Sequence, residues 1–77
     1  MSKFLHYNLI FRPEPEGGFT VLVPALPGCI SYGHDLAEAK EMARDAIAAY
    51  LKSARKRREK VVSDEHNFIA SLDVAYA

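Results

Sequence analysis

The amino-acid sequence predicts an α+β domain whose elements follow the order β-β-β-α-β. Three observations support this class. Apolar side chains alternate with polar ones in short segments before position 33, recur every three or four positions between 36 and 58, and alternate again between 68 and 76. A crossover helix returns the last strand parallel to a neighbour, so we expect a mixed sheet of three antiparallel strands plus one parallel strand, with one helix packed on one face.

The first two strands are expected on either side of a glycine turn. The segment from Phe4 to Phe11 has one apolar face, and it is followed by Gly17-Gly18, a pair that reaches positive φ at low cost. Alternation resumes at Phe19 and continues to Val23, until Pro24, which lacks an N–H group, ends the ladder. The sequence therefore predicts a β-hairpin at this position.

A third strand and the helix are expected next. Pro27-Gly28 indicates a second turn, and the segment from Cys29 to Tyr32 is long enough for a short strand. The helix is predicted from Leu36 to Arg58, and Asp35 and Glu38 have the spacing of a capping box at its start. An alanine-rich apolar stripe favours close packing of the helix on the sheet: Leu36, Ala39, Ala43, Ile47, Tyr50, Leu51 and Ala54.

The fourth strand is predicted from Phe68 to Tyr76, after a connection over residues 61–67. A single helix covers only one face of a sheet. The other face would carry a mixture with many apolar members, which we take as a candidate contact surface: Phe4, His6, Asn8, Ile10, Thr20, Leu22, Ile69, Ser71 and Asp73.

Length and composition indicate one globular domain over residues 1–77. The chain is 49% hydrophobic and 26% charged, which is typical of a folded domain rather than a disordered one. A core of this size supports only modest stability, which oligomerisation or binding to a partner would increase. We expect a homo-oligomer. The single cysteine cannot form an internal disulfide, and the N-terminal apolar run is too short for a signal peptide or membrane span, so we expect a cytoplasmic protein.

Candidate catalytic and metal-binding residues are few. A two-metal nuclease needs several converging carboxylates, and the segment from Phe4 to Arg12 contains no acid. His6, His34 and His66 lie far apart without a second ligand at helical spacing. We therefore expect no enzyme, no metal and no cofactor.

A basic run ends the predicted helix. It contains six cations and one anion, a net of +5, so the remainder of this neutral chain carries −5. Cations at a helix C-terminus oppose the negative end of the helix dipole, which is a structural role. Their number also allows a second interpretation, contact with nucleic acid, through Lys52, Arg55, Lys56, Arg57, Arg58 and Lys60.

The chain resembles the HicB-like antitoxin family of bacterial toxin–antitoxin systems. The matching features are Gly17-Gly18-Phe19, the segment Val23-Pro24-Ala25-Leu26-Pro27-Gly28-Cys29, Gly33, and Asp35-Leu36-Ala37-Glu38-Ala39. The resemblance implies a partial ribonuclease H-like fold. It also implies that the protein neutralises a HicA-type toxin, which cleaves messenger RNA, by binding and occluding it.

The resemblance leaves two functions open. The first is toxin binding through an exposed sheet edge or face and the loop around Tyr32, His34 and Asp35. The second is a nucleic-acid-binding or regulatory module that uses the basic helix end. Many family members carry a further C-terminal module that binds operator DNA, whereas residues 1–77 are expected to form one domain without a separate C-terminal DNA-binding domain.

Overall fold

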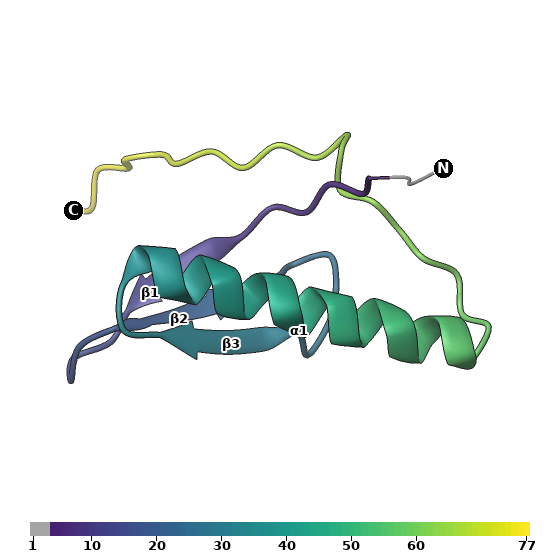
Figure 1. Cartoon of the computed structure of the whole chain (residues 1–77). Coiled ribbons are helices and arrows are strands. Elements are labelled where there is room, and N and C mark those ends of the chain that lie inside the picture. The colour runs from purple at the N-terminus through teal and green to yellow at the C-terminus, as the bar shows by residue number, and fades with distance from the viewer. Residues whose placement is uncertain (1–3) are drawn as a thin grey trace.

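A computed structural model describes residues 4–77 of the chain, with the elements β1 (Ile10–Pro13), β2 (Phe19–Leu22), β3 (Ile30–Gly33) and α1 (Leu36–Lys56). The strands form one antiparallel sheet in the order β1-β2-β3. Helix α1 lies along one face of this sheet (Figure 1). The predicted α+β class, the three antiparallel strands and the single helix on one face are confirmed.

The two turns form where glycine was expected to permit them. Gly17 and Gly18 have φ values of +108° and +79°, and the turn is closed by a hydrogen bond from the Glu14 N–H to the Gly18 carbonyl at 3.0 Å. Gly28 has a φ of +82° in the loop between β2 and β3. Positive φ is disfavoured for residues that carry a Cβ atom, so these glycines set the backbone path.

The Val23–Cys29 loop is part of the core. Three backbone hydrogen bonds fold it on itself, and its side chains Val23, Leu26 and Cys29 are buried. A helix of 21 residues is about 31 Å long, whereas a strand of four residues spans about 13 Å. The C-terminal half of α1 therefore extends beyond the sheet, and this loop packs beneath it against Ala46, Ile47 and Tyr50.

The inner face of the sheet packs closely on the helix. Val21, Ala39 and Ala43 have no solvent exposure and form one cluster, with Phe11 beside them. The small alanine side chains bring α1 near the sheet, as the sequence predicts. Gly33 belongs to this contact rather than to a turn, because a Cβ atom there would overlap the backbone of Ala39.

The first strand is shorter than predicted. It begins at Ile10 instead of Phe4, because the β2 ladder ends at Leu22, two residues before Pro24, and residues 4–9 have no strand beside them on that side. Those residues are held by the connection after the helix. The His6 carbonyl accepts the Asp64 N–H at 2.7 Å, and the Asn8 N–H donates to the Asp64 carboxylate at 3.3 Å.

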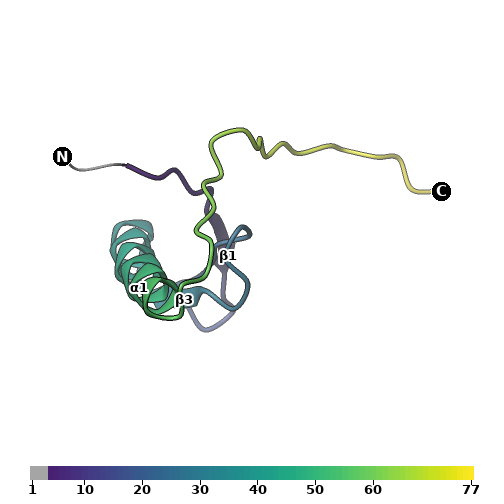
Figure 2. The same ribbon diagram turned by 90° about the vertical axis from the view of Figure 1, so that its right-hand side faces the viewer.

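The helix and the last segment also differ from the prediction. α1 ends at Lys56 instead of Arg58, because Arg57 is its C-cap residue and Arg58 takes a φ of +57°. Residues 68–76, expected to form a fourth strand parallel to a neighbour, take part in no ladder. They leave the body after Asn67 and extend into solvent (Figure 2), so no strand lies near enough to pair with them.

Candidate partner-binding surfaces

The face of the sheet opposite α1 carries an exposed apolar row. The register places Ile10 beside Leu22 and Leu22 beside Ile30, one residue from each strand. Ile10 is 41% exposed and Ile30 is 57% exposed, while Leu22 between them is half-buried. We call these three residues the open-face row. Aligned apolar side chains on an uncovered sheet face are typical of a surface that binds a partner.

A second row on the same face is polar. It consists of Arg12, Thr20 and Tyr32 in register. The Glu14 carboxylate accepts a hydrogen bond from the Thr20 hydroxyl at 2.6 Å and one from Arg12 at 3.4 Å. The Thr20 bond, followed by Arg12, lowers the pKa of Glu14. The apolar row therefore has a polar border of fixed side chains, which is the usual composition of an interface rim.

The predicted toxin-binding residues Tyr32, His34 and Asp35 lie together where β3 joins α1. The Tyr32 ring meets the His34 ring edge-on at 6.0 Å, and the Tyr32 hydroxyl donates to the Gly17 carbonyl at 2.8 Å. All three residues are exposed. Tyr32 connects this corner to the open face, because it also belongs to the polar row.

Asp35 also caps the N-terminus of α1. Its carboxylate accepts the Glu38 N–H at 2.8 Å, so the predicted N-cap is confirmed. The Glu38 carboxylate accepts a hydrogen bond from the His34 N–H at 2.8 Å. In a capping box the donor is the N–H of the N-cap residue, here Asp35, so the observed donor lies one residue earlier. These bonds fix the loop that presents Tyr32 and His34.

The six predicted basic residues lie at the end of α1 and just after it, and all are exposed: Lys52, Arg55, Lys56, Arg57, Arg58 and Lys60. Arg57 is held within the chain. It forms an ion pair with Glu59 at 2.8 Å and donates to the Ser53 hydroxyl. The bond to Glu59 raises the pKa of Arg57 and, in return, lowers that of Glu59. One of the six cations is thus partly neutralised.

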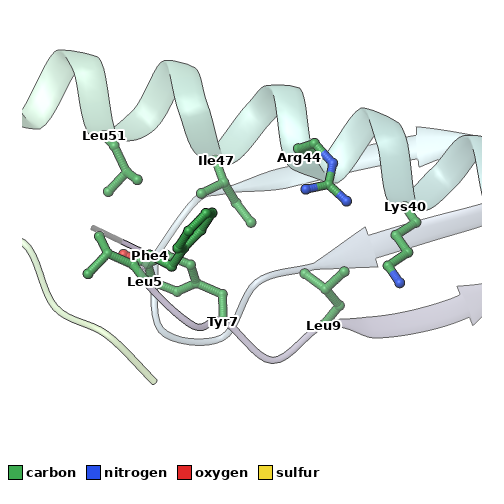
Figure 3. A pocket seen from close by; sticks show the side chains of 8 residues that line it. All are labelled: Phe4, Leu5, Tyr7, Leu9, Lys40, Arg44, Ile47 and Leu51. Atoms are coloured by element: carbon green, nitrogen blue, oxygen red, sulfur yellow. The ribbon is translucent and has the colours of Figure 1, made fainter. Parts of the chain in front are cut away.

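A groove of about 330 Å³ runs between α1 and the segment before β1. Figure 3 shows Ile47 reaching from the helix toward the ring of Phe4. We call it the α1 groove, and it is lined by Phe4, Leu5, Tyr7, Leu9, Lys40, Arg44, Ile47 and Leu51. Its surface is mostly apolar, and both of its charged residues are cations.

The described residues contain one buried cysteine and no metal-binding cluster. Within residues 4–77, no three histidine, cysteine or acidic side chains lie close enough to hold a metal ion. Cys29 is buried among Val23 and Leu26, and burial raises the pKa of its thiol, so the reactive thiolate form is disfavoured. Across the same residues, no helix is long and apolar enough to cross a membrane.

The sequence predicted some residues of these surfaces and missed others. Ile10, Thr20 and Leu22 were predicted on the uncovered face, and the structure places them there. Ile30 and Tyr32 were missed as members of that face, although their alternation with Ser31 was a usable signal. Asp64 was missed as an anchor, because its partners in the N-terminal segment are more than fifty positions away.

Comparison with known proteins identifies similar chains. A sequence model of a family described as the HicB-like antitoxin of bacterial toxin–antitoxin systems matches residues 7–74. The UPF0150 protein Ta0767 of Thermoplasma acidophilum is 38% identical over 60 residues, covering 78% of this chain and 87% of the relative. A UPF0150 protein of Helicobacter pylori is 32% identical over 64 residues, covering 83% and 89%. The UPF0150 protein ssl0259 of Synechocystis is 33% identical over 61 residues, covering 79% and 84%.

Proposed function

Because the chain belongs to the HicB-like antitoxin family, we propose that it neutralises a HicA-type, mRNA-cleaving toxin by binding and occluding it. The family match over residues 7–74 carries this proposal, and it confirms the resemblance inferred from the motifs. An antitoxin acts by binding, which agrees with a non-enzymatic, regulatory role. We place this action in the cytoplasm, where messenger RNA is translated.

The proposed toxin-binding surface combines the open-face row with the corner formed by Tyr32, His34 and Asp35. Two features support this choice. The open-face row provides apolar surface on the sheet that a partner can cover. The corner provides Tyr32, an exposed aromatic residue of a type enriched among interface hot spots. The fixed capping bonds of Asp35 reduce the ordering cost of binding.

The first experiment is co-expression with a HicA-type toxin, followed by co-purification and an RNA-cleavage assay. We expect a stable complex in which cleavage is abolished. Ile30→Glu should weaken the complex by about tenfold to hundredfold, because it places a charge in the apolar row. Met42→Glu is the matched control, since Met42 is 44% exposed on the helix, outside this surface. Absence of any complex with the wild-type chain would refute the antitoxin assignment.

A nucleic-acid-binding role is the second candidate, and the cluster of exposed cations at the end of α1 supports it. Binding of this kind depends on released counterions, so its affinity should fall steeply with salt. Replacing Arg55, Lys56, Arg57 and Arg58 by neutral residues should abolish it and leave toxin neutralisation intact. If the wild-type chain is not retained on RNA or DNA even at low ionic strength, this second role is wrong.

A further inference from the structure

β3 is an uncovered edge of the sheet. The strand order β1-β2-β3 gives it a neighbour on one side only, within the part of the chain that the structure describes (Figure 1). Exposed edges in native proteins usually contain charged residues or proline, which oppose pairing with another chain. β1 follows this rule, since it contains Arg12 and ends at Pro13. β3 has the sequence Ile-Ser-Tyr-Gly, with no charge and no proline. Its outer edge is therefore open to a further strand.

The register shows which backbone groups lie on this outer edge. The Val23 N–H donates to the Cys29 carbonyl at 3.2 Å. This pair directly follows the pair of Leu22 and Ile30 in the register. In an antiparallel ladder, residues that hydrogen-bond to their neighbour alternate with residues that do not. Ile30 and Tyr32 therefore direct their N–H and carbonyl groups away from β2, with a spacing of about 7 Å between the two residues. No other backbone group within residues 4–77 bonds to them.

A shallow groove runs beside this edge. It has a volume of about 450 Å³ and lies between the start of β3 and the C-terminal half of α1. We call it the β3 groove. It is lined by Cys29 and Ile30 on the strand side and by Ala46, Ala49 and Ser53 on the helix side. The three helix residues have small side chains, so they leave room next to the edge for the side chains of another chain.

We propose that one extended segment of the toxin adds to β3 as a further strand of the sheet, an inference that rests on the proposed function. The backbone of this segment satisfies the outward groups of Ile30 and Tyr32, because an extended chain repeats its own donors and acceptors at the same spacing. Side chains alternate across a strand. Every second side chain of the segment therefore enters the β3 groove, and the others continue the open-face row beyond Ile30.

Two observations favour the toxin over an unrelated partner. Ile30 and Tyr32 also supply side chains to the proposed toxin-binding surface, so a toxin on that surface already lies beside the edge. The charges are complementary as well. β3 ends beside the carboxylates of Asp35 and Glu38, and the chain outside residues 52–60 has a net charge of −5. A toxin that cleaves RNA needs a cationic surface to bind phosphates.

Amide hydrogen exchange, measured by NMR on the full chain alone and in complex with a HicA-type toxin, tests the proposal. In the free protein, the N–H groups of Ile30 and Tyr32 should exchange fast and those of Ser31 and Gly33 slowly, because only the second pair donates to β2. In the complex, Ile30 and Tyr32 should exchange at least about tenfold more slowly. A stable complex in which their exchange is unchanged would overturn strand addition and leave the proposed function standing. Absence of any complex would refute the proposed function itself.

Proline at position 30 separates a backbone hydrogen bond from simple burial of the surface. Ile30→Pro removes the outward N–H but no bond of the ladder with β2, and proline is tolerated on edge strands whose N–H faces solvent. Ile30→Ala is the matched control, since it shortens the same side chain and keeps the N–H. We expect Ile30→Pro to weaken the complex at least about tenfold more than Ile30→Ala, measured by calorimetric titration.

Equal losses of affinity from the two folded variants would overturn the proposal, even where exchange is slowed, because the slowing then reflects burial alone. If Ile30→Pro does not fold, the exchange of Ile30 and Tyr32 in the wild-type complex decides between strand addition and its absence.

Discussion

At the scale of single residues, Asp64 holds the two ends of the chain together. Asp64 is the one charged residue that is buried among those the structure describes, with 4% exposure. Its carboxylate accepts hydrogen bonds from the Asn67 amide and from both the backbone and the amide of Asn8. These bonds, that of Asn67 above all, lower the pKa of Asp64, because they favour the charged form.

Stability should therefore fall at acid pH. A carboxyl group whose pKa is lower in the folded state contributes stability above its unfolded pKa, and this contribution is lost as the pH falls through the folded value. An unperturbed aspartate, which stands for Asp64 in the unfolded chain, has a pKa of 3.8. We expect the free energy of unfolding, measured in urea, to decrease as the pH is lowered below about 4. Asp64→Asn should reduce this dependence.

The control for this measurement is Glu65→Gln, which removes a neighbouring exposed carboxylate and should leave most of the pH dependence in place. Some dependence should remain even in Asp64→Asn, because hydrogen bonds also lower the pKa of Glu14 and Glu59. Equal acid sensitivity of the wild type and Asp64→Asn would show that Asp64 is not the anchor described above.

The two glycines of the hairpin turn differ in their surroundings. Both have positive φ, so alanine at either position costs about 1–2 kcal/mol in backbone strain. A Cβ atom at Gly17 meets open space, whereas at Gly18 it would overlap the Tyr32 hydroxyl and the Gly33 carbonyl. We expect Gly18→Ala to destabilise the protein by at least about 1 kcal/mol more than Gly17→Ala in thermal or urea unfolding. Equal losses would mean that Tyr32 moves aside freely.

At the scale of elements, the end of α1 shows a cap built without glycine. The Glu59 N–H donates to the Ala54 carbonyl at 2.9 Å, and the Arg58 N–H donates to the Arg55 carbonyl at 3.1 Å. This is the Schellman pattern, in which the residue with positive φ is usually glycine. Arg58 occupies that position with a φ of +57°, so the basic run includes one residue whose backbone is strained.

Replacement of Arg58 should reveal this strain. Arg58→Gly should be more stable than Arg58→Ala by about 1 kcal/mol, because both lose the same charge but only glycine relieves the positive φ. The measurement is the midpoint of urea unfolding for the two variants at one pH and salt concentration. Identical midpoints would show that this residue leaves the left-handed conformation without cost.

The elements were predictable to the extent that they depend on local signals. The positive-φ glycines, the Asp35 cap and the alanine stripe each act within a few residues, and the structure contains all of them. Strand length depends instead on pairing. Residues 4–9 and 68–76 have the alternation of strands. Alternation indicates which side chains share a face, but it does not show that another strand lies alongside to form hydrogen bonds. The sequence alone therefore overestimated the sheet at both ends.

At the scale of the whole molecule, the candidate surfaces depend on register between strands. Ile10, Leu22 and Ile30 form a row only because two hairpins align them, and no spacing along the chain indicates this alignment. The corner at Tyr32 was predictable, because its residues are consecutive or nearly so. The Asp64 anchor was not, since it joins segments that only the fold brings together.

The positions of these contacts along the chain also determine the timing of folding. β1 pairs with β2, β2 pairs with β3, and α1 follows β3 directly, so the body is built from sequence neighbours. Local topologies of this kind fold fast. The bonds of His6 and Asn8 to Ser63 and Asp64 span 57 and 56 positions, so closing them costs more chain entropy. During synthesis on the ribosome, the hairpins and the helix can form first, and the junction between the two ends closes last.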